Sequence, residues 1–301
     1  EALTLSTDGK SVKASVSRLE ADTYTLSVTE KLTSIGGLAC APSAYTYQAK
    51  RMNLTADFND LAVWGDWAVG EEKSATELAA KTPWLKGQAS VNGAYGVSRF
   101  MLTEDGGLTF RWTDGAGTST YQSQMYIQQE SAVTCGTVVY TFNIKHGPQK
   151  GGSTRQCVYI MGETGKTQNT VEPMGTALRN GSTQATISKA QADSDGYFPL
   201  QYVLTSDTPQ SDWQYTVYCG EKSIMTGTLS RSEFGGISGI RLYNYADGGN
   251  TSVTNDITIK NVRAEYIGAA LQATAGDYDA ETQTLPLIFN AAPSAVTEEQ
   301  L

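Results

Sequence analysis

Apolar and polar residues alternate with a period of two along several short segments of this chain. In the two clearest segments, "TVVYTFNIKHG" and "DWQYTVYCG", the apolar positions are Val138, Tyr140, Phe142, Ile144, Trp213, Tyr215, Val217 and Cys219. Side chains two apart on a strand share a face, so each segment predicts a strand with one buried face. Turns rich in Gly, Asn and Asp separate the segments. Many short strands joined in this way are typical of a β-sandwich or jelly roll.

The segment "DITIKNVRAEYIG", residues 256–268, alternates and then changes parity. Ile257 and Ile259 fall on one parity, whereas the apolar residues from Val262 onward fall on the other. One extra residue at Lys260-Asn261 would return both halves to the same face, which is the definition of a β-bulge. Two short strands with a kink are the alternative. We favour the bulge because no proline or turn interrupts the segment.

One helix is predicted, in "GEEKSATELAAKTPW". Ser74 followed by Glu77 fits a capping box, and Pro83 ends the Ala/Leu run that comes after it. A single short helix among strands is a connection, so the predicted class stays all-β.

Composition and charge exclude several kinds of partner. Charged residues make up 18% of the 301 residues, below the roughly 25% of typical soluble domains. The net charge of −9 and the absence of a basic run argue against nucleic acid and anionic membrane surfaces. No segment approaches the ~20 consecutive apolar residues of a membrane span.

Four cysteines, Cys40, Cys135, Cys157 and Cys219, are widely spaced and form no CxxC motif. Such spacing disfavours a zinc site. One or two disulfides and small buried thiols are both left open.

Three segments carry a resemblance to a known family. They are "LTADFNDL", "SDWQYTVYCGEKSIMTGTLS" and "ISGIRLYNYADGGNTSVTNDITIKNVRAEYI". Together they resemble the concanavalin A-like (laminin G-like) jelly roll of bacterial surface proteins and carbohydrate-active enzymes. The resemblance implies a jelly-roll domain over residues 51–268.

The two ends resemble a different module. "ADTYTLSVTEKLTSIGGLACAPSAYTYQ" is similar to the last strands of bacterial Ig-like domains of the S-layer type, and "DYDAETQTLPLIFNAAPSAVTEEQL" to their beginning. The resemblance implies the C-terminal part of an Ig-like domain at 1–50 and an N-terminal part at 269–301. Either each end belongs to a neighbouring repeat, which we favour, or the two segments complete one smaller Ig-like β-sandwich.

Catalytic constellations are sparse in the sequence. His146 is the single histidine and lies beside a Gly-Pro turn, and no GxSxG motif occurs, so Ser/His/Asp catalysis is disfavoured. Jelly-roll glycoside hydrolases use two carboxylates that face one cleft. No strand here shows acids in alternation, since pairs such as Glu71-Glu72 are adjacent in predicted loops. We therefore lean towards a protein that is not an enzyme.

Two turns contain clustered oxygen donors. "DFND" supplies Asp57, Asn59 and Asp60, and "DSDGY" supplies Asp193 and Asp195. Calcium prefers such ligands, but short Asp/Asn/Gly turns are more often only turns. We expect no cofactor, with calcium as the one open alternative.

Aromatic residues beside polar ones give the candidate ligand site. Sugars stack their apolar faces on flat rings, while their hydroxyls bond to a few polar groups. The candidates, in "VWGDWAVG" and "LYNYADGGN", are Trp64, Trp67, Tyr243, Asn244, Tyr245 and Asp247. Tyr243 and Tyr245 share a strand face and form a predicted platform. For Trp64 and Trp67, burial in the core is the competing and stronger interpretation.

The expected function is that of an extracellular, non-catalytic module of a large bacterial cell-surface protein. It would be monomeric and bind a glycan or another surface ligand. The alternatives are a polysaccharide-degrading enzyme, hydrolase or lyase, and a stalk module without a ligand. Aromatic, acidic or bland side chains lining the concave sheet would separate the three.

Overall fold

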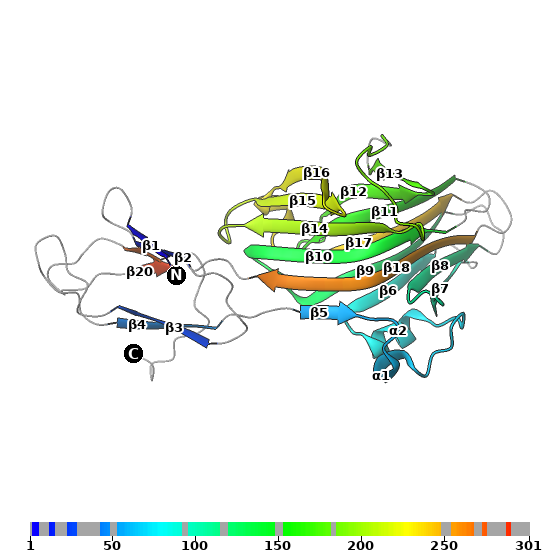
Figure 1. Cartoon of the computed structure of the whole chain (residues 1–301), viewed down its shortest axis with the longest axis horizontal. Coiled ribbons are helices and arrows are strands. Elements are labelled where there is room, and N and C mark those ends of the chain that lie inside the picture. The colour runs from blue at the N-terminus through cyan, green and yellow to red at the C-terminus, as the bar shows by residue number, and fades with distance from the viewer. Residues whose placement is uncertain are drawn as a thin grey trace, which may run out of the picture.

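A computed structural model describes most of the chain between residues 53 and 267, together with short strands from both ends. The described residues are 2–5, 12–15, 23–28, 43–48, 53–91, 96–114, 120–147, 153–181, 185–247, 254–267, 273–275 and 287–289. Two antiparallel sheets stack face to face and form a jelly-roll β-sandwich (Figure 1). The predicted all-β class is therefore confirmed.

The larger sheet has eight strands. Its order is β16 (Lys222–Leu229), β15 (Trp213–Cys219), β14 (Phe198–Ser206), β10 (Gly136–His146), β18 (Thr254–Ile267), β8 (Leu108–Asp114) and β7 (Gly96–Leu102), and β5 (Asn53–Ala56) also pairs with β18. Every pairing is antiparallel.

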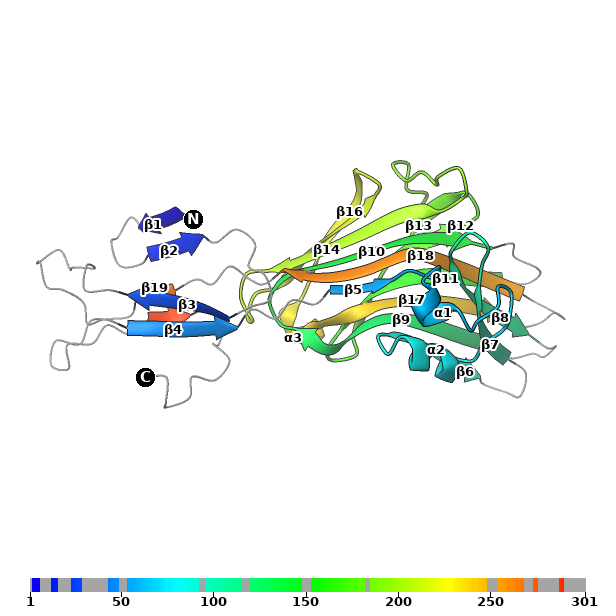
Figure 2. The ribbon, with the colours of Figure 1, turned by 60° about the horizontal axis from the view of Figure 1, so that its bottom comes forward.

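The second sheet has six strands and forms the other layer of the sandwich (Figure 2). Its order is β13 (Ala177–Asn180), β12 (Thr167–Met174), β11 (Ser153–Gly162), β17 (Ile237–Asp247), β9 (Thr120–Val133) and β6 (Leu85–Val91). Strands distant in sequence lie side by side, because β17 separates β9 from β11 just as β18 separates β8 from β10.

The core lies between the two sheets and is rich in aromatic rings. Phe142 stacks on Tyr202 at 5.9 Å between ring centroids, and Phe100 stacks on Phe110 at 5.4 Å. Burial alternates along β10 and β15 with the parity that the sequence predicts. Such burial of apolar area is the main stabilising contribution to a sandwich of this size.

Two of the largest core side chains have hydrogen-bond partners for their polar atoms. The Tyr140 hydroxyl donates to Gln129 Oε1 at 2.7 Å, and Trp213 Nε1 donates to the carbonyl of Gly235 at 3.1 Å. Trp213 is fully buried, as expected, and Trp84 packs against the core from its edge. The side chain of Trp112, which we also expect in the core, lies outside the described residues.

The predicted β-bulge is confirmed in β18. Thr141 of β10 pairs with Arg263, whereas Asn143, two residues on, pairs with Lys260, three residues back. The one extra residue lets Ile259 and Val262, which have opposite parity, both point into the core. Asn261 takes a φ of 55°, in the left-handed region that asparagine tolerates better than most residues.

Three short helices connect strands. The predicted helix α2 (Ala75–Lys81) has the full capping box, since Ser74 accepts from the Glu77 amide while the Glu77 carboxylate accepts from the Ser74 amide. The single-turn helices α1 (Leu61–Trp64) and α3 (Arg231–Phe234) were not predicted, because one turn is too short to show a period of 3.6 residues. No helix among the described residues is long and apolar enough to cross a membrane.

Short strands from both ends of the chain lie together beside the sandwich (Figure 1). β1 (Ala2–Leu5) pairs with β2 (Val12–Ser15), β3 (Thr23–Val28) with β4 (Ser43–Gln48), and β19 (Ala273–Ala275) with β20 (Leu287–Phe289). β19 lies next to β2. This contact is what two complementing segments predict, while the division into domains at residues 50 and 268 stays a prediction.

The bulge gives a test of the fold. Replacing Asn261 with Val puts a β-branched residue at positive φ and should lower the free energy of unfolding by about 1–2 kcal/mol. Asn261→Gly, which tolerates this conformation, is the matched control and should change stability by much less. Urea denaturation measures both, and equal stability of the Val and Gly variants would contradict the assigned bulge.

Candidate functional site

Two of the predicted ligand-binding residues belong to the core. Trp64 is 2% exposed and Trp67 is 8% exposed, and their rings meet edge to face at 5.2 Å. Trp64 also contacts Phe58 at 5.4 Å between centroids. A buried ring offers no face to a sugar, so we correct their assignment: both anchor α1 to the sandwich, as the competing interpretation held.

The four predicted residues on β17 separate by parity. Asn244 is 1% exposed and lies on the buried side of the strand, so the prediction that it contacts a ligand was wrong. Tyr243 is partly exposed on the outer side of the six-stranded sheet. Tyr245 and Asp247 lie on β17 at the same parity as Tyr243, but their side chains are outside the described residues.

A row of paired residues crosses the outer face of this sheet. Lys86 of β6 is opposite Tyr126 of β9, Tyr126 is opposite Arg241 of β17, and Arg241 is opposite Tyr159 of β11. Directly opposed residues in neighbouring strands point the same way and lie within reach of each other. The row therefore alternates cation, phenol, cation and phenol across four strands. We call it, together with Tyr243, the tyrosine–arginine face.

The burial pattern fixes the direction of this row. Leu85, Met125, Leu242 and Ile160, each next in sequence to a residue of the face, are all at most 1% exposed and belong to the core. Because alternate residues point to opposite sides of a strand, the residues of the row point outward. Lys86 is exposed, and Tyr126, Arg241 and Tyr159 are partly exposed.

Ring contacts hold the centre of the face. The guanidinium carbon of Arg241 lies 4.3 Å from the ring centroid of Tyr159 and 5.4 Å from that of Tyr243. The two rings are themselves perpendicular, at 88° and 5.9 Å. Arg241 Nε is buried and has no hydrogen-bond partner among the described residues. Cation–π contacts of this kind contribute about 0.5–2 kcal/mol each.

The phenols on this face are neutral donors at ordinary pH. Burial raises the pKa of Tyr159 and of Tyr126, while the positive charge of Arg241 lowers both in part. The Tyr126 hydroxyl is hydrogen-bonded to Gln124. The face thus presents neutral phenol groups and the cations Lys86 and Arg241 around partly exposed ring surface.

A buried acid lies beside the face. Glu172 of β12 is 2% exposed, and its Oε1 accepts from Arg155 Nη2 at 2.6 Å and Arg155 Nε at 2.8 Å. The Cys157 thiol donates to the same oxygen at 3.3 Å, and Asn169 Nδ2 does so at 3.4 Å. The Oε1 atom of this carboxylate is therefore occupied by neighbours within the protein.

The outer face of the eight-stranded sheet is different in kind. Its partly exposed residues on β10 and the neighbouring β14 include Thr137, Val139, Thr141, Asn143, Gln201 and Val203. Small and uncharged side chains of this sort offer little to recognise. Elsewhere on this sheet charged side chains are paired, as Arg111 is with Asp256 and Arg263 with Glu265.

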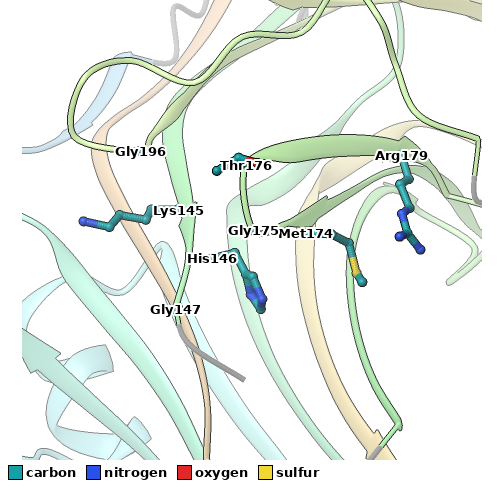
Figure 3. A pocket seen from close by; sticks show the side chains of 8 residues that line it. All are labelled: Lys145, His146, Gly147, Met174, Gly175, Thr176, Arg179 and Gly196. Carbon is teal, nitrogen blue, oxygen red and sulfur yellow. The ribbon is translucent and has the colours of Figure 1, made fainter. Parts of the chain in front are cut away.

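A pocket opens at the C-terminal end of β10 (Figure 3). It has a volume of about 540 Å³ and is lined by Lys145, His146, Gly147, Met174, Gly175, Thr176, Arg179 and Gly196. Figure 3 shows that the Lys145 side chain points away from those of His146 and Arg179. Lys145 Nζ is 5.0 Å from the ring centroid of Tyr197, outside the pocket lining. The cations of this pocket therefore do not converge.

His146 is the last residue of β10, at a strand end as predicted. Burial lowers its pKa below the ordinary value, so the imidazole is neutral at physiological pH. Its Nδ1 is buried without a hydrogen-bond partner among the described residues. No nucleophile–base arrangement involving it appears in the part of the chain that the structure describes.

In the two candidate calcium turns, aspartate carboxylates accept hydrogen bonds from nearby backbone amides. Asp57 Oδ1 accepts from the Asn59 amide at 2.9 Å, and Asp60 caps α1 through the amide of Ala62 at 2.9 Å. Asp193 Oδ1 accepts from the amides of Asp195 and Tyr197 at 3.0 and 2.8 Å. These are the bonds of ordinary Asx turns and a helix cap. Calcium binding stays a prediction.

Comparison with known proteins gives structural neighbours only. No protein-family model matches the chain, and no curated protein matches it. A cellulose-induced protein, Cip1, aligns over 70% of this chain and 96% of its own length, at 12% identity and a TM-score of 0.39. An alginate lyase of polysaccharide lyase family 7, AlgAT5, aligns over 67% and 93%, at 13% identity and 0.39. A family GH16 endo-β-1,3(4)-glucanase, SCLam, aligns over 74% and 93%, at 12% identity and 0.39. Likeness at this level does not assign an activity.

Most residues of the face are not among the predicted ligand-binding residues. Tyr243 was predicted, but Lys86, Tyr126, Tyr159 and Arg241 were not. Arg241 has the parity of Tyr243 in "RLYNYAD", so its outward direction is readable from the sequence. Its neighbours across β9 and β11 depend on strand order and register, which the sequence does not reveal.

Cys157 gives a test of the buried cluster beside the face. Burial, reinforced by Glu172, raises the pKa of its thiol to about 12, so the reactive thiolate is scarce at pH 8. We expect iodoacetamide at pH 8 to leave Cys157 unlabelled in the native protein and to label it fully in 8 M urea. Peptide mass spectrometry measures the difference, and similar labelling in both states would contradict the buried arrangement.

Proposed function

We propose that this chain is a non-catalytic module that binds carbohydrate on the tyrosine–arginine face. The single observation that supports this most is the grouping of three tyrosines with Lys86 and Arg241 on one outer face. Partly exposed rings supply stacking surface, and phenol, guanidinium and ammonium groups supply donors for sugar hydroxyls. A few polar groups on an otherwise aromatic surface are what carbohydrate recognition requires.

The side chains of the face disfavour the hydrolase alternative. Hydrolysis by the two-carboxylate mechanism needs a second acid about 5–10 Å from the first across an open groove. On the described part of this face the carboxylates are Glu172, which is buried and paired with Arg155, and Glu130, which is exposed four residues along β9 from Tyr126. A buried, ion-paired carboxylate is poorly placed to protonate a glycosidic oxygen.

The stalk alternative predicts a bland face, and the tyrosine–arginine face is not bland. A stalk module predicts no grouping of rings and cations on one outer face, whereas here a guanidinium lies against two tyrosine rings. The wider setting of the proposal is the one expected from the sequence. The chain would act as a monomeric, extracellular part of a bacterial cell-surface protein.

Loss of one ring from the face gives the direct test. Tyr159→Ala removes a ring that contacts Arg241 and Tyr243, and we expect about tenfold weaker binding of any glycan that the wild-type chain binds on an array. Tyr218→Ala is the matched control, because Tyr218 is a partly exposed tyrosine on the outer face of the eight-stranded sheet. It should leave affinity unchanged.

Two results would overturn the proposal. The first is an array on which the wild-type chain binds no glycan. The second is equal affinity of the wild-type and Tyr159→Ala proteins for every glycan bound, with circular dichroism showing that both are folded.

A further inference from the structure

Arg241 differs from four of the other described arginines, although Arg179 and Arg231 likewise have no carboxylate oxygen within 4 Å among the described residues. Arg99, Arg111, Arg155 and Arg263 each lie within 4 Å of a carboxylate oxygen. Among the described residues no carboxylate lies within that distance of Arg241. Its guanidinium instead contacts the rings of Tyr159 and Tyr243 and the Tyr126 side chain. A guanidinium stays charged at every physiological pH, so this centre carries a positive charge that no described carboxylate neutralises by direct contact.

From this charge we propose that the tyrosine–arginine face selects a carboxylate-bearing saccharide, one with uronic acid units, through Arg241. The inference rests on the proposed function and adds the substrate class. Guanidinium presents planar, paired donors that match the two oxygens of a carboxylate, and such a bidentate pair is stronger than a bond to a neutral hydroxyl. The flanking sugar ring would meet the tyrosines.

The geometry pre-organises Arg241 for this role. Contacts with Tyr159 at 4.3 Å and Tyr243 at 5.4 Å hold the guanidinium on the sheet, and Nε is buried, so the stem of the side chain is fixed. A side chain that is already ordered loses little entropy when the ligand binds. Ring contacts also leave the guanidinium charge uncancelled, which an ion pair within the protein would not.

Two cations, Lys86 and Arg241, lie in the row although the chain carries −9 overall. Of the acids on this sheet, Glu172 is paired with Arg155, and Glu130 lies four residues along β9 from Tyr126. Lys86 lies two strands from Arg241 in the same row, roughly 10 Å away at the usual strand spacing. A second carboxylate farther along an acidic chain would meet this second cation. Salt screens the repulsion from distant acids within about 10 Å at 0.1 M.

The experiment compares one oligosaccharide with and without its charge. Isothermal titration calorimetry would use oligogalacturonate, the same oligomer with its carboxylates reduced to neutral alcohols, and a sulfated galactose oligomer of equal length. We expect the wild-type chain to bind the carboxylate form at least tenfold more tightly than the reduced form and than the sulfated form. A preference for the sulfated oligomer, or equal binding of acid and neutral forms, would overturn the inference.

Substitutions test whether Arg241 causes the preference for the carboxylate form. Arg241→Gln should abolish the discrimination between acid and reduced forms to within about twofold, and Arg241→Lys, which keeps the charge but not the paired donors, should retain part of it. Arg263→Gln is the control, because Arg263 is exposed on β18 of the other sheet. An Arg241→Gln protein that is folded by circular dichroism and still prefers the acid would also overturn the inference.

The same data separate this inference from the proposed function. If neutral oligosaccharides bind and Tyr159→Ala weakens them while charge has no effect, the acidic substrate class is wrong and carbohydrate binding stands. If neither charged nor neutral oligosaccharides bind, both the inference and the proposed function fail.

Discussion

The structure depends on the alternation of side chains across paired strands. In the six-stranded sheet, one parity of β6, β9, β17 and β11 fills the core with Leu and Ile, and the register of the pairs then brings the other parity into line outside. Tyr126, Arg241 and Tyr159 become neighbours for that reason, although more than 30 residues separate each from the next in sequence. The shift of one residue in any of these strands would bury the face and expose the core.

The bulge in β18 preserves the same alternation of side chains in the eight-stranded sheet. A long strand that crosses the sandwich must keep its apolar residues inward along its whole length, and Asn261 at positive φ provides the one-residue correction. The outer faces of the two sheets also differ in their side chains. Beside the small uncharged residues of β10 and β14, the larger sheet presents cations paired with acids, whereas the smaller one groups rings with the cations Lys86 and Arg241, so the core is shared but recognition is proposed for one surface only.

Local patterns predicted the local structure well, and long-range contacts poorly. The strands, the capping box at Ser74 and the bulge at Asn261 could be predicted because each depends on neighbours in sequence. The assignment of Trp64 to a ligand site failed because exposure depends on what packs over a residue, here Phe58 and Trp67. The cross-strand partners of Arg241 were beyond reach for the same reason: strand order is set by the whole sandwich.

The central claim is that ligand recognition resides on the tyrosine–arginine face. The most direct measurement is a crystal structure of the chain with a bound acidic oligosaccharide. The account predicts a sugar ring against Tyr159 and Tyr243 with its carboxylate on the guanidinium of Arg241. An oligosaccharide bound instead in the pocket beside His146, or on the eight-stranded sheet, with Arg241 free of ligand, would contradict it.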